Sequence, residues 1–134
     1  LVEARRFVSS AYRAVGVRGL DEPLRLLPIE SLRGRRLVAF SGIATPESFF
    51  DQLDDLGYDV RERVRFPDHH WFDAVDLRQL RDAVARQGAT ALVTTEKDLV
   101  RLPPDRDSSI YALVVEVAPH HDRDAIVGWV MGES

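Results

Sequence analysis

Short apolar runs alternate with helical patterns along most of this 134-residue chain. Three of the runs are rich in β-branched or aromatic residues and lack polar alternation, which is typical of strands covered on both faces of a parallel sheet. They span residues 37–40, 91–93 and 110–115. A fourth run, residues 59–66, alternates apolar residues with arginines and predicts an edge strand with one wetter face. The pattern therefore predicts a mostly parallel, four-stranded sheet.

Helical spacing of apolar residues fills the intervals between these runs. The first helix should begin at Thr45 and Pro46, because a threonine can cap a helix and proline suits the first helical position, and it should end at Gly57. Further helices are expected over residues 74–87, over residues 96–102 and from Asp122 onward. This order favours a small doubly wound α/β fold, flanked by helices and built with right-handed crossovers.

The first 33 residues follow a different pattern. Apolar residues flank a turn-like sequence at residues 19–23, which predicts a β-hairpin or an extended arm. A helix over residues 3–15 is the competing interpretation. We therefore expect two parts, a linker arm with a β-hairpin over residues 1–33 and an α/β lobe over residues 34–134.

Composition narrows the classes of function. The chain has no cysteine, which excludes disulfides, a thiol nucleophile and cysteine-ligated metal centres. Its formal net charge of −4 gives no overall attraction to nucleic acid or to an anionic bilayer. No apolar stretch approaches the roughly 20 residues of a membrane-spanning helix, and no signal-peptide pattern opens the chain, so we expect a soluble, untargeted protein. All basic residues except Lys97 are arginine, and the single lysine therefore stands out.

Polar side chains gather where each predicted strand ends. The carboxyl ends of parallel strands meet at one edge of a sheet, and ligands bind outside that edge. We therefore expect the four polar clusters to share one rim. They span residues 41–45, 67–70, 94–98 and 119–122. Ordinary polar loops give the same pattern, so placement alone does not establish a site.

Gly42 lies in a turn before the amino terminus of a predicted helix, where backbone amides can hold an anion. A single glycine is weak evidence for such a site. The chain contains no Gly-x-x-x-x-Gly-Lys-Ser/Thr phosphate-binding loop. A plain strand-to-helix turn is the better interpretation.

The sequence Asp68-His69-His70 brings a carboxylate and two imidazoles together. Such a group can orient a base, shuttle a proton or bind a divalent metal ion. The structural alternative is that Asp68 caps a helix and both histidines are solvated on the surface.

The sequence from Thr94 to Asp98 follows a buried strand and opens a helix. Thr95 and Asp98 have the spacing of a capping box in which aspartate replaces the usual glutamate or glutamine. This spacing does not explain Lys97, because the first turn of a helix disfavours a cation. We therefore expect its ammonium to pair with Asp98, Glu96 or a ligand phosphate.

Three segments together resemble the tetraacyldisaccharide 4′-kinase family. They are residues 39–50, 66–70 and 94–101, in the family's order and spacing. The similarity covers about residues 34–134 and the carboxyl-terminal half of the family, and residues 1–33 resemble the stretch that joins its two lobes. Trp71 and Phe72 stand where the family often has proline and tyrosine, and residues 41–46 replace a common Ala-Gly-Ile-Gly-Asn-Pro.

The resemblance implies an activity in which this chain takes part. The family transfers the γ-phosphate of ATP, with magnesium, to the 4′-hydroxyl of the lipid A disaccharide 1-phosphate precursor. Its phosphate-binding loop and its catalytic and magnesium-binding aspartates belong to an amino-terminal P-loop lobe that this sequence does not contain. The chain alone would thus be inactive and bind neither cofactor. Its partners would be that lobe and the lipid precursor, with a cytoplasmic location peripheral to the inner membrane and no nucleic acid.

The resemblance also implies roles at the rim. His69 matches the family histidine that faces the catalytic aspartate across the interlobe cleft and tunes it as a base, and Asp68 would hold His69. Lys97 and Arg101 would meet phosphate or acidic groups. The candidate substrate- or phosphate-binding residues are Lys97, Arg101, Thr95, Glu96, Asp98 and Gly42. No residue is predicted to bind a metal.

Two other functions remain open from the sequence. One is a non-catalytic anion- or nucleotide-binding module that acts through a partner, which predicts that the isolated chain binds ATP. The other is a metal-dependent phosphoesterase of the Asp-His-His type, which predicts tight manganese binding at Asp68 and His69.

Overall fold

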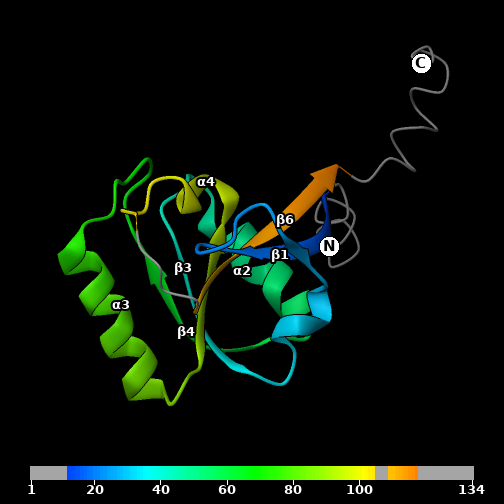
Figure 1. The fold of residues 1–134 in the computed structure, drawn as a ribbon, viewed down its shortest axis with the longest axis horizontal. Helices are drawn as coiled ribbons and strands as arrows, with labels where there is room; N and C mark the ends of the chain where they lie inside the picture. Colours follow the sequence, from blue (N-terminus) through cyan, green and yellow to red (C-terminus); the bar gives the residue numbers. More distant parts are fainter. Residues whose placement is uncertain (1–11, 105–108, 118–134) are drawn as a thin grey trace, which may run out of the picture.

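The computed structural model describes residues 12–104 and 109–117, which form one six-stranded sheet with helices on both faces (Figure 1). A short 3₁₀ helix, η1, follows the first two strands. The elements in chain order are β1 (Tyr12–Gly19), β2 (Leu26–Leu27), η1 (Ile29–Leu32), β3 (Arg36–Ser41), α2 (Pro46–Asp55), β4 (Asp59–Arg65), α3 (Ala74–Gln87), β5 (Ala91–Thr95), α4 (Glu96–Leu99) and β6 (Ile110–Val117).

The strand order is β2-β1-β6-β5-β3-β4. Strands β6, β5, β3 and β4 are parallel, which confirms the four predicted strands and their direction. The sheet nevertheless has six strands, because β1 pairs antiparallel with both β6 and β2. The prediction of a four-stranded sheet is corrected accordingly.

The hairpin of β1 and β2 joins the sheet because β6 would otherwise leave a row of unpaired backbone groups at the edge. Val17 of β1 lies opposite Leu113 of β6, and both side chains are buried. The predicted hairpin is confirmed, and the competing helix is wrong for residues 12–15, which belong to β1. The rest of that predicted helix lies outside the described residues.

Alternate residues of β3 point into two different hydrophobic clusters. Leu37 and Ala39 pack on the face covered by α2, whereas Val38 and Phe40 pack on the face covered by α3 and α4. All four side chains are fully buried, as expected for a central strand of a doubly wound sheet. Within the described part of the chain, no helix is long and apolar enough to cross a membrane.

The helix boundaries follow local capping chemistry. Helix α3 has the predicted bounds, with Asp73 and Asp76 forming a capping box and Gly88 ending the helix at φ 62°. Helix α2 begins at Pro46 as predicted, but Thr45 makes no side-chain capping hydrogen bond. Helix α4 is shorter than the predicted 96–102, since it ends at Leu99. The helix expected from Asp122 lies beyond the described residues.

Candidate functional site

Three loops meet at the carboxyl edge of the parallel strands. The Gly42 carbonyl after β3 accepts a hydrogen bond from the His69 amide after β4, at 2.8 Å. The Gly42 amide donates to Oδ1 of Asp98, in α4 after β5, at 3.0 Å. These contacts confirm the shared rim for the first three polar clusters. The fourth cluster, residues 119–122, falls outside the described residues.

Asp98 occupies the centre of this edge and is fully buried. Besides Gly42, its carboxyl group accepts hydrogen bonds from Ser41 Oγ at 3.0 Å and from Thr95 Oγ1 at 2.7 Å. Thr94 Oγ1 is 3.3 Å from the same carboxyl but only 2.8 Å from the Phe40 carbonyl, to which it donates. We call these residues the Asp98 cluster: Ser41, Gly42, Thr94, Thr95 and Asp98.

The predicted capping box at the start of α4 is half formed. Thr95 Oγ1 accepts a hydrogen bond from the Asp98 amide at 3.1 Å, as a capping threonine should. The Asp98 side chain does not return to the Thr95 backbone. It reaches across the sheet edge to the loop after β3 instead, and so ties β3 to β5 and α4.

Gly42 is required by close packing. A Cβ atom at this position would lie 2.9 Å from the Pro67 carbonyl oxygen and 3.2 Å from His70 Cβ. Because its amide already donates to Asp98, Gly42 does not offer that amide to an anion. The absence of a Cβ at Gly42 instead allows the loop after β4 to pack closely against the Asp98 cluster.

That loop, residues 67–70, carries His69 and is called the His69 loop below. His69 has φ 64°, a left-handed conformation that is uncommon and unfavourable for a residue with a Cβ. Its side chain is 76% exposed. Arg101 Nη2 lies 3.0 Å from His69 Nδ1, whereas Asp68 Oδ2 lies 3.7 Å from Nε2, too far for a hydrogen bond. Arg101 therefore makes the hydrogen bond to the imidazole, and the predicted partner Asp68 lies near the other ring nitrogen without one.

His70 is partly buried, with 26% of its side chain exposed, and packs against neighbouring side chains. Its ring stacks on Phe66 with centroids 5.0 Å apart, and Nε2 lies 2.8 Å from Asp76 Oδ2. Burial alone would raise the pKa of Asp76, but hydrogen bonds from His70 and the Asp73 amide outweigh it and hold that pKa below its ordinary value. The structural alternative for this motif is thus wrong for the cap, since Asp73 and not Asp68 caps α3, and for His70, which is partly buried and packed on Phe66.

Lys97 and Glu96 lie beside the Asp98 cluster but face other neighbours. Glu96 Oε2 is 3.1 Å from Arg18 Nε of β1, an ion pair that links α4 to the hairpin. Lys97 is exposed and lines a cavity of about 480 Å³ between α2, β5 and β6, together with Ile43 and Leu113. Its predicted pairing with Asp98 or Glu96 does not occur, because the first is buried and the second pairs with Arg18.

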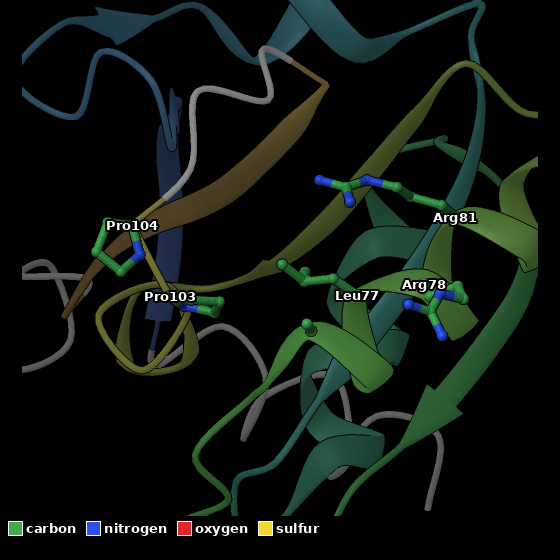
Figure 2. Close-up of a pocket in the computed structure, with 6 residues that line it drawn as sticks. Leu77, Arg78, Arg81, Pro103 and Pro104 are labelled. Atoms are coloured by element: carbon green, nitrogen blue, oxygen red, sulfur yellow. The ribbon is translucent and has the colours of Figure 1, made fainter.

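A second hollow of about 370 Å³ lies between α3 and the prolines that follow α4 (Figure 2). In this view the Leu77 side chain extends from α3 toward Pro103. Its lining residues are Ala74, Leu77, Arg78, Arg81, Pro103 and Pro104. None of them belongs to the predicted site, so this hollow is separate from the rim.

The two histidines of the Asp-His-His motif do not converge on one point. His69 faces Arg101, whereas His70 faces Asp76. Over residues 12–104 and 109–117, no group of three or more His, Cys, Asp or Glu side chains could hold a metal ion.

Sequence reasoning missed the contact between Arg101 and His69, which are 32 positions apart in the chain. A faint signal exists, because Arg101 follows Asp98 at the spacing of one helical turn and its amide donates to the Asp98 carbonyl at 2.9 Å. The sequence pattern could not reveal that the Arg101 side chain turns outward to the His69 loop while the Asp98 side chain is buried.

Comparisons with known proteins agree on one family. The sequence model of the tetraacyldisaccharide-1-P 4′-kinase family matches residues 12–131. A tetraacyldisaccharide 4′-kinase of Nitrobacter hamburgensis is 46% identical over 107 residues, covering 76% of this chain and 32% of the relative. One of Rhodospirillum centenum is 51% identical over 87 residues, covering 65% of this chain and 26% of the relative.

A solved structure has a similar fold. It is a crystal structure of LpxK from Aquifex aeolicus in complex with ATP, with a TM-score of 0.55 and 20% identity. The similarity covers 87% of this chain and 34% of that one. The chain thus spans about a third or less of the length of the relatives it matches.

Proposed function

The chain belongs to the tetraacyldisaccharide 4′-kinase family, and we propose that it forms the carboxyl-terminal lobe of such a kinase. The observation that carries this proposal is the match of the family model over residues 12–131. In the whole enzyme, the γ-phosphate of ATP would pass to the 4′-hydroxyl of a lipid A disaccharide 1-phosphate precursor. Residues 34–134 would form the lobe, and residues 1–33 the arm that connects it, attached to the sheet through β1 and β6.

The residues described here do not by themselves fit a magnesium nucleotide. Asp98 is buried and its carboxyl group is engaged by Ser41, Gly42 and Thr95, while Glu96 pairs with Arg18. No phosphate-binding loop occurs in the sequence. We therefore assign ATP and magnesium to the other lobe and derive no step of the reaction through them.

His69 is the residue that we propose for the reaction-facing role. Its side chain is 76% exposed at the carboxyl edge, and its strained backbone is held by the Gly42 carbonyl. Strained residues concentrate at functional sites, where the surrounding structure maintains them. An imidazole N–H that meets a carboxylate of the other lobe would orient that carboxylate as a base for the sugar hydroxyl.

The other rim residues support this role in different ways. Exposed Lys97 remains our candidate for contact with phosphate or acidic groups. Asp98, Gly42 and Thr95 would act from the interior by fixing the loops, since their polar groups are already hydrogen-bonded to one another. Phosphoryl transfer depends mainly on positioning and electrostatics, so a lobe that closes over the nucleotide-binding lobe suits this reaction.

A lipid precursor as the substrate would place the whole enzyme at a membrane surface. We propose that it is cytoplasmic and peripheral to the inner membrane. The support is the substrate class of the family.

A chimera tests the proposed function. In the Nitrobacter hamburgensis relative, the segment that matches this chain is replaced by residues 12–131 of this chain. We expect this Nitrobacter chimera to transfer phosphate from ATP to the 4′-position of a tetraacyldisaccharide 1-phosphate. The unmodified relative is the positive control. A folded chimera without kinase activity, beside an active relative, would overturn the proposal.

The isolated chain separates the kinase lobe from the nucleotide-binding module. Titration with ATP should give no measurable heat of binding, because the phosphate-binding loop would belong to the other lobe. Tight binding of ATP to the isolated chain would favour the module that acts through a partner.

A further inference from the structure

The contact between Arg101 and His69 fixes which ring nitrogen carries the proton. An arginine side chain has five N–H donors and no acceptor. Arg101 Nη2 lies 3.0 Å from His69 Nδ1, so Nδ1 must be the acceptor. In a neutral imidazole one nitrogen accepts and the other donates, and the proton of His69 is therefore on Nε2.

Both partners of this contact have a fixed backbone. The Arg101 amide donates to the Asp98 carbonyl at 2.9 Å, and the Arg101 carbonyl accepts from the Phe72 amide at 3.1 Å. The His69 amide donates to the Gly42 carbonyl at 2.8 Å. Asp98 and Gly42 of the Asp98 cluster thus hold the main chain of both residues, which places their side chains within reach of each other.

The other nitrogen of the ring, Nε2, makes no hydrogen bond within the described residues. The nearby Asp68 carboxylate is 3.7 Å from Nε2, beyond hydrogen-bond distance. The side chain is 76% exposed, so a group outside the described chain can approach the ring.

We propose that Arg101 is a positioning residue that holds His69 in the Nε2–H tautomer and directs this N–H toward an acceptor outside the chain. The inference rests on the proposed function, in which that acceptor is a carboxylate of the other lobe. It replaces the sequence-based prediction that Arg101 binds phosphate directly. Arg101 acts through His69 and touches no reacting atom.

Nitrogen NMR of the ¹⁵N-labelled chain tests the tautomer directly. At about pH 8.5, well above the ordinary imidazole pKa of about 6.5, the ring is neutral in an unperturbed histidine. In the wild-type chain, Nδ1 of His69 should resonate as an unprotonated nitrogen and Nε2 as a protonated one. A wild-type spectrum with the proton on Nδ1 would overturn the proposal.

Two variants test whether Arg101 causes the preference. Arg101→Met should move both His69 nitrogen shifts toward values averaged over the two tautomers. Arg101→Lys should restore much of the wild-type pattern, since an ammonium also donates. His70 is the internal control, because its partner is Asp76 and its shifts should stay the same. Identical His69 shifts in the wild type and Arg101→Met would contradict the role of Arg101.

Kinetics of the Nitrobacter chimera distinguish this inference from the proposed function. Arg101→Met should lower kcat about 10-fold or more, the range for residues that orient a catalytic group, with little change in the KM for ATP. An inactive chimera whose NMR shows the Nε2–H tautomer would reject the proposed function and keep the tautomer assignment. An active chimera that needs His69 but retains full kcat in Arg101→Met would reject the positioning role alone.

Discussion

The Asp98 cluster and the His69 loop are joined through Gly42, but the central polar residue of the first is buried and that of the second is exposed. Asp98 is fully buried, and its carboxyl group accepts hydrogen bonds only from its own chain. His69 is exposed, strained at φ 64° and held through one ring nitrogen, with the other left open. A buried network whose polar groups are all hydrogen-bonded to one another acts as a scaffold. A strained, exposed residue held by that scaffold remains available to a partner.

Adjacent residues repeat this contrast. His70 stacks on Phe66 and is 2.8 Å from Asp76, so it belongs to the scaffold. His69 is the preceding residue, but its ring contacts Arg101 instead. The Asp-His-His motif therefore combines one structural and one outward-facing histidine.

Removal of the Asp98 carboxyl group should have the largest effect on stability. Asp98→Ala leaves the Ser41 and Thr95 hydroxyls and the Gly42 amide without their acceptor. We expect the free energy of unfolding to fall by about 3 kcal/mol, because each buried polar group left unpaired is costly. Urea denaturation of the chain measures the change.

Asp98→Asn is the matched control for this prediction. Its amide keeps the shape and one acceptor oxygen but turns an NH₂ toward other donors. The expected loss is intermediate, about 1–2 kcal/mol. If Asp98→Ala unfolds at the same urea concentration as the wild type, the cluster is not the scaffold described here.

A methyl group at Gly42 should disturb the connection between the two regions. Gly42→Ala places a Cβ 2.9 Å from the Pro67 carbonyl oxygen, and overpacking of this kind costs about 1–3 kcal/mol. Gly34→Ala is the control, since Gly34 has φ 80° and nothing lies within 4 Å of the point where its Cβ would stand. Both variants lose stability, but only Gly42→Ala should shift the His69 amide resonance. An unchanged His69 resonance would break the proposed connection.

Glycine at position 69 should affect stability less, and in the opposite direction. A left-handed backbone costs a residue with a Cβ about 1–2 kcal/mol, and glycine avoids this cost. Glycine is also more flexible in the unfolded state, which lowers the free energy of unfolding by about 0.5–1 kcal/mol. His69→Gly should therefore raise the free energy of unfolding by about 0.5 kcal/mol, the difference between these two effects.

His70→Ala should lower the free energy of unfolding by about 1–2 kcal/mol through loss of stacking and the Asp76 hydrogen bond. If urea denaturation shows that His69→Gly and His70→Ala lower the free energy of unfolding equally, the two histidines do not differ in the way described.

A buried phenol lies at the other end of the sheet and makes stability depend on pH. Tyr58 donates to the Ile29 carbonyl at 2.7 Å, and burial raises the pKa of its phenol from 10.0 to about 12. The folded protein thus binds this proton more tightly than the unfolded chain, so this contribution to stability is lost as pH rises from 10 toward 12. Tyr58→Phe should lack this pH dependence. Absorbance titration that shows all three tyrosines ionising near pH 10 would contradict it.

The sequence predicted the parallel core and its rim because hydrophobic periodicity records burial along each element. The runs around Leu37 and Leu92 became central strands, and the polar residues after them met at one edge as topology requires. The attachment of β1 to β6 could not be read from periodicity, since edge pairing depends on a contact between distant segments.

Side-chain direction limited the prediction of the site. Asp98, Lys97 and Glu96 are neighbours in sequence, but one is buried, one is exposed at a cavity and one pairs with the hairpin. A capping pattern identifies the start of a helix and leaves open which way each carboxylate turns. The Arg101 contact depended on the left-handed turn at His69, for which the sequence held no signal.

The central claim is that His69 completes a catalytic arrangement whose other members lie in a second lobe. The most direct test is the kcat of the Nitrobacter chimera that carries His69→Ala. The account predicts that kcat falls about 100-fold or more, as for loss of a group that assists proton transfer, while the chain unfolds at nearly the same urea concentration. A kcat equal to that of the parent chimera would contradict the account.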